Sequence, residues 1–359
     1  MLDTTLNYVA AGAEGFFKNG KWSFDLNTMP IDYYLINAST FVGSKNIEQI
    51  VKQKEEANAA GKQIFVDSGG FQLATETIDY LDPQGIVEVQ NRTANQGFIL
   101  DVPTMRRTRG AGAGGLELDA SPEYFNHCLT KTIGHLNSAK HIPRNFEYYA
   151  VVQGVSVDQL QAWWTAIQQV DTYQGIGTKG VILEQVLSGL FFMETNDIDC
   201  HHILGLGAAQ RILLVRYFYM LSKKTMKRVT YDNTNHIQYA KYMQAVMPFL
   251  NCFYDKNENK EHFEKFSGVK MDGISPNDMT TFISTKNLYY YGLQNRLINL
   301  LSTPTTVRDF VVANFKAMEI YLNCIDDFFD KGIAYVLKKY PDLDYVPKKV
   351  ATSNLMDFI

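Results

Sequence analysis

Five short stretches of this sequence carry side chains that can bind or activate a small molecule, and each follows an apolar run. The first is Asp67-Ser68-Gly69-Gly70-Phe71-Gln72, directly after Ile64-Phe65-Val66. An apolar run that ends in Ser-Gly-Gly predicts a buried strand entering a tight loop. The two glycines allow positive φ or a close approach of the backbone to a flat ligand. Asp67 also suits the cap of a following helix, so this stretch alone leaves a catalytic and a structural role open.

The other four stretches end candidate strands in the same way: Asp101, Gln153-Gly154, Ser188-Gly189 and Asp232. In parallel α/β folds the carboxyl ends of the strands meet over one face, where ligands bind. We therefore expect these residues to line one mouth. Each alone is an ordinary turn or cap residue. Together, at equivalent strand ends, they favour a functional site.

Three carboxylates suit displacement at the anomeric carbon of a sugar, in which one carboxylate attacks C1 and a second group transfers protons. Proton transfer alone, as in an isomerase or a lyase, is the alternative. Asp, Gln and glycine backbone can together donate and accept hydrogen bonds in one plane, which favours a planar heterocycle such as a nucleobase. The histidines, among them His201, His202 and His236, are scattered. We predict no metal site from them.

The elements that must position these residues fit an α/β fold, a (β/α)8 barrel. We expect strands at residues 33–37, 63–67, 97–101, 148–153, 186–191, 202–207, 228–232 and 248–253. Helical patterns lie at residues 45–60, 82–95, 121–140, 156–170, 208–222 and 234–247. The predicted parts are an N-terminal lead-in at 1–30 with a hairpin turn at Asn19-Gly20, the barrel at 31–253, and a C-terminal helical extension at 254–359 with helices near 285–301 and 306–338.

Composition narrows the class of protein. The chain has 359 residues, 46% of them hydrophobic, which is ample for a barrel with an appendage. A net charge of -4 argues against a globally basic nucleic-acid binder and leaves a local basic patch open. The cysteines Cys128, Cys200, Cys252 and Cys324 form no CxxC pair, which argues against a disulfide framework. We expect a cytoplasmic protein without membrane spans or an N-terminal signal.

The stretch from Asp67 to Gln72 resembles the DSGGFQ signature of the tRNA-guanine transglycosylases, (β/α)8 enzymes that exchange a guanine base for a 7-deazaguanine. Four further segments and one aspartate resemble the family in its order: Val152-Gln153-Gly154 (VQGG), Ser188-Gly189-Leu190 (GGL), Leu204-Gly205-Leu206-Gly207 (MGVG), Asp232 (the nucleophile) and Asn287-Leu288-Tyr289-Tyr290-Tyr291 (the HNLxFY helix). The resemblance covers residues from about 30 to about 300.

The resemblance implies a pentosyltransferase in which Asp232 attacks C1′ of a nucleotide, expels guanine and holds a covalent glycosyl-enzyme intermediate. Asp67 would be the general acid and base. Asp101, Gln153 and the backbone at Gly189 would read the edge of the base, and Phe71 would stack on its face. The other residues that the resemblance places around the substrate are Ser68, Gly69, Gly154 and Ser188. No cofactor is implied.

The sequence also departs from the family. The tRNA enzymes carry a CxCxxC zinc site completed by a histidine, whereas here Cys252 stands alone and Lys286 precedes Asn287. We therefore expect no zinc subdomain. Asp232 is followed by Asn233-Thr234-Asn235 where the family has Cys-Val-Leu, and Asp101 by Val102-Pro103-Thr104 where it has Glu-Cys-Thr. These differences put docking of tRNA in question.

The departures resemble the branch of phage and bacterial enzymes called DpdA, which insert 7-deazaguanines such as preQ0 into DNA. If phage-encoded, the protein would act in the host cytoplasm. Candidate phosphate contacts are Arg106, Arg107, Arg109, Lys223, Lys224 and Lys227, and an ordinary solvated surface is the alternative for the arginine cluster and for the lysine cluster. A tRNA transglycosylase without zinc and a catalytically silent subunit that binds nucleic acid remain alternatives, and a homodimer is left open.

Overall fold

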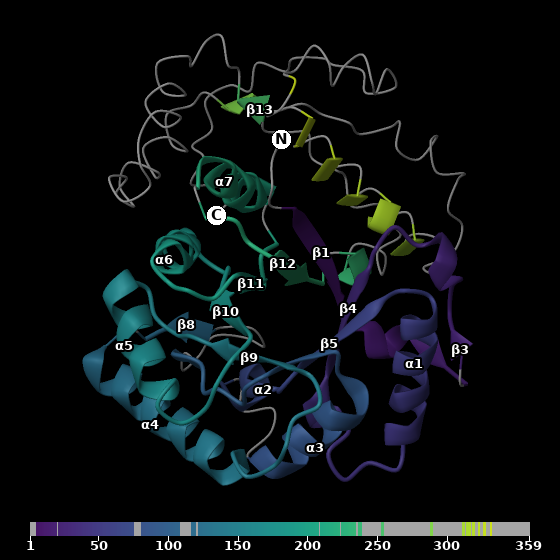
Figure 1. The fold of residues 1–359 in the computed structure, drawn as a ribbon, viewed down its shortest axis with the longest axis horizontal. Helices are drawn as coiled ribbons and strands as arrows, with labels where there is room; N and C mark the ends of the chain where they lie inside the picture. The colour runs from purple at the N-terminus through teal and green to yellow at the C-terminus, as the bar shows by residue number, and fades with distance from the viewer. Residues whose placement is uncertain are drawn as a thin grey trace.

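The computed structural model describes residues 5–238 except 20, 75–79, 108–115, 120, 208, 223 and 235. It also describes residues 253–254, 288–289, 311–312, 314–316, 318–319, 322–323, 326–327 and 331. Eight parallel strands close into a barrel in the order β1-β12-β11-β10-β9-β6-β5-β4 (Figure 1). They are β1 (Leu6–Ala11), β4 (Tyr33–Asn37), β5 (Gln63–Asp67), β6 (Gln96–Phe98), β9 (Glu147–Val151), β10 (Gly175–Lys179), β11 (Cys200–Leu204) and β12 (Arg228–Asn233).

Helices follow the strands and form the outer layer of the barrel (Figure 1). They are α1 (Ile47–Ala59), α2 (Gly70–Ala74), α3 (Pro83–Thr93), α4 (Pro122–Ala139), α5 (Val157–Ile167), α6 (Leu183–Glu194) and α7 (Ala209–Leu221). Three of them begin where the sequence provides a cap: the side chains of Asp82, Ser121 and Ser156 accept hydrogen bonds from backbone N–H groups of the first turn. The structure confirms the predicted (β/α)8 fold.

The predicted strands differ from the barrel strands at two places, and a third predicted strand lies almost wholly outside the described residues. Residues 6–11 of the predicted lead-in form β1, which pairs with β12 on one side and β4 on the other, so the barrel begins earlier than residue 31. Residues 186–191 lie in α6, and the sixth strand in chain order is β10 instead. The predicted strand at 248–253 lies outside the described residues except Phe253, and the barrel closes without it.

The hairpin prediction near Asn19 is confirmed. β2 (Phe17–Lys18) and β3 (Lys21–Trp22) pair antiparallel. Asn19 has φ 53°, the left-handed conformation that an Asn-Gly turn uses. The hairpin packs on α1, where the Trp22 indole Nε1 donates to the carbonyl of Gln53 at 3.3 Å.

The interior of the barrel is filled by layers of side chains. At the amino end of the strands, Gln96 Nε2 donates to Gln63 Oε1 at 2.7 Å, and the Arg228 guanidinium pairs with Glu147. Because β12 is not a neighbour of β9, Arg228 and Glu147 meet through the barrel interior. This polar layer closes the amino end.

An aromatic layer lies above it. The rings of Phe65, Phe98, Tyr149 and His202 contact one another at centroid distances of 4.9–5.8 Å. They come from β5, β6, β9 and β11. His202 on β11 is no strand neighbour of Phe65 or Phe98, so these rings also meet inside the barrel. The layer is a packed floor beneath the carboxyl ends of the strands.

The described C-terminal residues pack beside β4, β12 and the 3-10 turn that follows β1. The described residues between 311 and 331 are helical. The Phe315 ring contacts Phe16, Phe24 and Tyr34, and Asn314 Nδ2 donates to the carbonyl of His236 at 2.9 Å. The helix predicted near 285–301 is wrong at residues 288–289, since β14 (Leu288–Tyr289) pairs antiparallel with β13 (Phe253–Tyr254). Most of the predicted helix at 234–247 lies outside the described residues.

Deletion of residues 1–11 tests the role of β1. The deletion removes the strand that joins β4 to β12, so we expect loss of the cooperative thermal transition, measured by circular dichroism. Deletion of residues 1–4 is the control and should keep the transition within a few degrees. A cooperative transition at an unchanged temperature after deletion of 1–11 would contradict the barrel closure described above.

Candidate active site

Five polar side chains come from the carboxyl ends of different barrel strands. Asp67 ends β5, Lys179 ends β10, and Asp232 lies one residue before the end of β12. Asp101 and Gln153 follow β6 and β9 by three and two residues. Four of these five were predicted from the sequence, and the mouth brings them together as expected. Lys179 was not predicted.

Asp101 and Gln153 form one unit. Gln153 Nε2 donates to Asp101 Oδ2 at 2.5 Å, and both side chains are buried. The other polar atom of this amide, Gln153 Oε1, is buried and has no hydrogen-bond partner among the described residues. A buried acceptor without a partner is costly unless a ligand satisfies it. This oxygen is therefore suited to accept an N–H from a bound molecule.

The two glycines after Ser68 are both required by the local backbone. Gly69 has φ 91°, and a Cβ there would lie 2.5 Å from Cβ of Ser39. A Cβ at Gly70 would lie 2.4 Å from the backbone oxygen of Asp101. Gly69 thus lets the loop after β5 approach the turn after β4, and Gly70 lets it approach the loop after β6. Ser68 is fully buried, and its Oγ has no partner among the described residues.

Burial raises the pKa of Asp67 to about 6. The Lys179 ammonium opposes this, the carboxylates of Asp101 and Asp232 raise the pKa further, and the backbone N–H of Gly69 lowers it. Burial also raises the pKa of Asp101, opposed by Lys179 and then by the bond from Gln153. A carboxyl group with a pKa near neutrality can both donate and accept a proton, which is what a general acid and base needs.

Asp232 is held by two donors. His202 Nε2 lies 3.1 Å from Asp232 Oδ1, and the backbone N–H of Gly205 donates to the same oxygen at 3.0 Å. The Gly205 φ of 72° is the left-handed conformation, which lets the chain turn sharply after β11 and aim this N–H at the carboxylate. His202 was not predicted to belong to the site, because the scattered histidines were weighed only as metal ligands.

Two apolar side chains stand exposed after barrel strands. Phe71 is 47% exposed and lies in α2, which follows β5, and Val181 is 42% exposed and follows β10. A single exposed apolar side chain is ordinary on a protein surface, so exposure alone does not identify a binding role. The role of Phe71 as a stacking surface for a flat ring stays a prediction.

Ser188 and Gly189 do not line the mouth. They lie in α6, on its buried face. A Cβ at Gly189 would meet Thr178 Oγ1 at 2.7 Å, so this glycine allows α6 to pack closely on β10. Ser188 Oγ donates to the carbonyl of Val155 at 2.8 Å and so holds the loop after β9. The predicted role of both in binding the base is wrong. Gly154, with φ 153°, is in that loop, where a Cβ would lie 2.7 Å from Cβ of Gln159.

The predicted lysine contacts to phosphate are also corrected. Lys224 Nζ donates to the carbonyls of Met193 and Ile198, at the end of α6, at 2.7 and 2.9 Å. Lys227 directly precedes β12 and lies 4.0 Å from Glu147, at the end of the barrel opposite the carboxylates. Neither is placed to contact a polymer bound at the mouth. Lys223 is outside the described residues.

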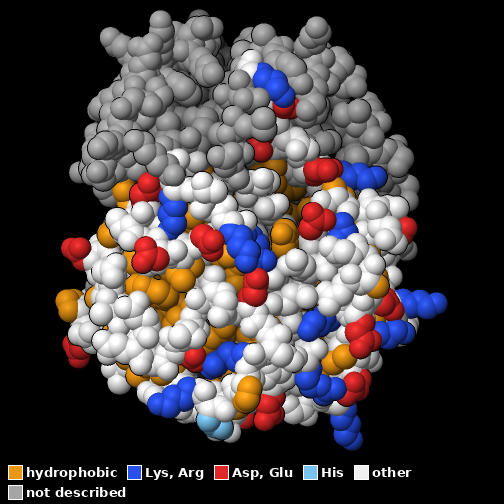
Figure 2. Space-filling model, viewed as in Figure 1, with side chains coloured by type: hydrophobic (Ala, Val, Ile, Leu, Met, Phe, Trp, Pro, Cys, Tyr) orange, Lys and Arg blue, Asp and Glu red, His pale blue; other side chains and the backbone are white. Residues whose placement is uncertain are grey.

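Arg106 and Arg107 lie on β7 (Met105–Arg107), which follows Asp101 and pairs antiparallel with β8 (Leu116–Leu118). This hairpin rises from the mouth side of the barrel, and Arg109 lies outside the described residues. Figure 2 shows acidic and basic side chains interspersed over the described part of one face, without a large patch of either sign there. Contact with a polyanion would therefore be local.

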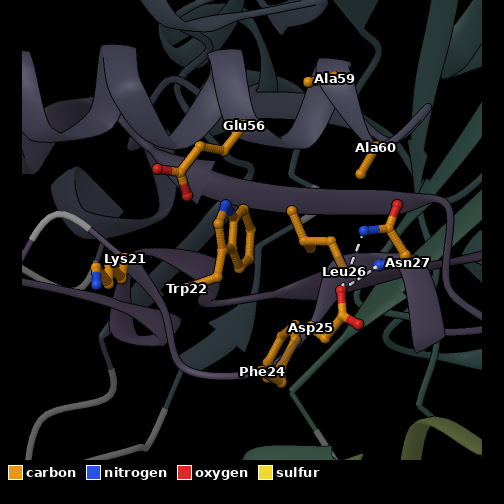
Figure 3. A pocket seen from close by; sticks show the side chains of 9 residues that line it. All are labelled: Lys21, Trp22, Phe24, Asp25, Leu26, Asn27, Glu56, Ala59 and Ala60. Atoms are coloured by element: carbon orange, nitrogen blue, oxygen red, sulfur yellow. Dashed lines mark hydrogen bonds between the residues drawn. The ribbon is translucent and has the colours of Figure 1, made fainter.

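A groove on the outside of the barrel lies apart from these residues. It runs between the β2–β3 hairpin, the turn at Asp25–Asn27 and the C-terminal end of α1, and Trp22, Leu26 and Glu56 line it (Figure 3). The end of α1 leads into the start of β5, so the groove is nearer the amino end of the barrel than the mouth. It contains none of the predicted site residues.

The described residues contain no group of three His, Cys, Asp or Glu side chains placed to hold a metal ion. In the same part of the chain, no helix combines the length and apolar character needed to cross a membrane. Cys128 and Cys200 are buried free thiols. Cys252 and Lys286, on which the expected absence of a zinc subdomain depends, lie outside the described residues.

No protein-family model matches this sequence, and no curated protein matches it. Among solved structures the chain is similar to a fructose-bisphosphate aldolase from Campylobacter jejuni, with 9% sequence identity and a TM-score of 0.37 over 90% of this chain and 91% of that chain. A likeness this distant does not bear on the reaction.

The raised pKa of Asp67 predicts a pH-dependent cost in stability. The folded state binds the Asp67 proton more tightly than the unfolded state, so the free energy of unfolding falls as pH rises from about 4 to about 6. At pH 7 we expect Asp67→Asn to stabilise the protein by roughly 2 kcal/mol, and at pH 4 to leave it unchanged. Urea denaturation at both pH values measures this. Asp158→Asn, an exposed site, is the control, and equal stability of wild type and Asp67→Asn at pH 7 would contradict the burial of this carboxyl.

Proposed function

We propose that this chain is a transglycosylase that exchanges a guanine base in DNA for a 7-deazaguanine such as preQ0. The observation that carries the proposal is the meeting of Asp67, Asp101, Gln153 and Asp232 at one mouth, from strands far apart in the sequence. These are the positions at which the sequence resembles the tRNA-guanine transglycosylases.

The proposed reaction uses the two carboxylates differently. Asp232 attacks C1′ of the nucleotide, the bond from C1′ to guanine N9 breaks, and guanine leaves after taking a proton from Asp67. The incoming deazaguanine then gives a proton back to Asp67 and attacks C1′, which releases Asp232. A pKa of about 6 allows Asp67 to serve in both directions near neutral pH.

Recognition of the base would rest on the buried acceptors. Asp101, Gln153 Oε1 and Ser68 Oγ offer hydrogen-bonding atoms at the site, and the N–H groups on the edge of a guanine or deazaguanine suit them. Phe71 is exposed and would stack on the base. The target nucleotide must leave its stack to reach this floor.

DNA is proposed over tRNA because the zinc-site cysteines and the family residues after Asp101 and Asp232 are missing from the sequence. Arg106 and Arg107 belong to β7, which follows the carboxyl end of β6, and they are the candidate phosphate contacts.

Side-by-side incorporation of labelled preQ0 and labelled guanine into duplex DNA, single-stranded DNA and tRNA tests the proposal. We expect label in DNA with the wild type. With Asp232→Ala we expect the rate of incorporation to fall at least 1,000-fold, because covalent catalysis needs the Asp232 carboxylate as nucleophile. Asp158→Asn is the control and should retain full activity. Label in tRNA alone would overturn the choice of polymer, and no label in any of them would favour a silent nucleic-acid-binding subunit.

Contact between the β7 hairpin and phosphate is tested by salt dependence. We expect the double variant Arg106→Gln, Arg107→Gln to weaken DNA binding and to reduce the slope of log affinity against log salt concentration by about 2, one for each lost phosphate contact. Lys227→Gln is the matched control, because Lys227 lies at the opposite end of the barrel. An equal loss in the control and the double variant would place DNA elsewhere on the surface.

A further inference from the structure

Both donors that reach the Asp232 carboxylate within the described residues bind the same oxygen. His202 Nε2 and the Gly205 N–H lie 3.1 and 3.0 Å from Oδ1, and both come from the end of β11. Oδ2 receives neither. The carboxylate therefore presents two unequal oxygens, one held and one open.

A second hydrogen bond determines which proton His202 carries. His202 Nδ1 lies 2.8 Å from Thr230 Oγ1. The Thr230 hydroxyl has two acceptors in reach, the carbonyl of His201 at 3.4 Å and His202 Nδ1 at the shorter 2.8 Å. Donation to Nδ1 leaves the proton of the neutral ring on Nε2, which donates it to Asp232. The opposite tautomer would point the Nε2 lone pair at a carboxylate oxygen, which is repulsive. We therefore assign the Nε2–H tautomer.

The ring itself cannot turn freely. His202 is fully buried, stacked on Phe65 at a centroid distance of 5.3 Å and against Phe98 at 4.9 Å. Thr230 and Asp232 lie on β12 two residues apart and so face the same side of that strand. Packing between two aromatic side chains and hydrogen bonds at both nitrogens fix the orientation of the His202 ring toward Asp232.

We propose that Thr230 and His202 are positioning residues that reserve Asp232 Oδ2 for the sugar carbon and stabilise the carboxylate as it leaves. The inference rests on the proposed function. In the first step the bond from Oδ2 to C1′ forms as the C1′–N9 bond breaks. In the second step the incoming base attacks C1′, the Oδ2–C1′ bond breaks, and its electron pair returns to the carboxylate.

The donors act unequally on these two steps. During attack they fix the orientation of the carboxylate but also stabilise its charge before reaction. During release they stabilise the charge that develops on the carboxylate. Loss of the His202 donor should therefore slow release more than attack, and the covalent adduct should accumulate.

The experiment follows the adduct between the enzyme and a labelled DNA oligonucleotide on denaturing gels, in single-turnover mode, before and after addition of free preQ0. For His202→Phe, which keeps a ring between Phe65 and Phe98, we expect release to slow about 10- to 100-fold and the adduct fraction to rise. His202→Gln keeps a side-chain N–H donor and should recover at least part of the release rate.

Thr230→Val tests the second positioning residue, and Thr178→Val is its matched control. Thr178 Oγ1 lies 2.7 Å from His201 Nε2, and His201 Nδ1 lies 2.6 Å from the Tyr219 hydroxyl, so the same Thr–His contact exists without a carboxylate at its end. Both variants remove a buried hydroxyl beside a histidine and should lower the melting temperature similarly. Only Thr230→Val should slow release of the adduct.

The outcomes separate the inference from the proposed function. Slower release in His202→Phe and Thr230→Val, with partial rescue in His202→Gln, supports the inference. Two results would overturn the inference alone, provided that the wild type forms the adduct. One is an equal rate of adduct release in Thr230→Val and Thr178→Val, and the other is an equal rate in His202→Phe and the wild type. Absence of adduct with DNA and with tRNA in the wild type overturns the proposed function, and the inference with it.

Discussion

The pairing of β1 with β12 is the constraint on which the site depends. These strands are more than 200 residues apart in the chain, and their register places Val9 opposite Asp232. Because side chains alternate along a strand, a slip of one residue would turn Asp232 away from the barrel interior. The same slip would remove Thr230 from the ring of His202. Closure of the barrel thus sets the direction of the carboxylate as well as the stability of the sheet.

The layers of the barrel explain why carboxyl groups in the mouth behave unusually. The aromatic floor formed by Phe65, Phe98, Tyr149 and His202 excludes water from beneath Asp67. A carboxyl group above such a floor loses hydration, which raises its pKa as at Asp67. The charged form of Asp67 makes the folded state less stable near neutral pH, and under the proposed function this cost accompanies a group that can transfer protons there.

Much of the barrel could be predicted because its strands are short apolar runs bounded by glycine or polar residues. β4 and β5 have the predicted bounds, and Asp67, Asp101, Gln153 and Asp232 follow from the strand ends. Residues 186–191 were wrongly predicted as a strand because α6 is buried over most of its surface, so its apolar run has no helical period. β10 was missed because Gly175 and Gly177 weaken the strand pattern, although Gly175 is needed where a Cβ would meet the Tyr149 ring at 2.2 Å.

The two unpredicted site residues were hidden for different reasons. Lys179 ends β10, so missing the strand meant missing the lysine; the step from Thr178 to Lys179-Gly180 is the signal that would have found it. His202 gives no signal in a single sequence, because its role depends on Thr230 and Asp232 across a strand pair. Tertiary register, and not local pattern, creates that contact.

The closed amino end of the barrel has a kinetic consequence. Among the described residues, the Arg228–Glu147 layer and the aromatic floor fill the interior below Asp232, so a molecule reaches this carboxylate from the mouth. In a base exchange, the outgoing base must then clear this opening before its replacement can occupy the same hydrogen-bonding atoms. If the proposed base exchange takes place at this mouth, the covalent intermediate imposes a ping-pong order, in which released guanine competes directly with the incoming base for the covalent form of the enzyme.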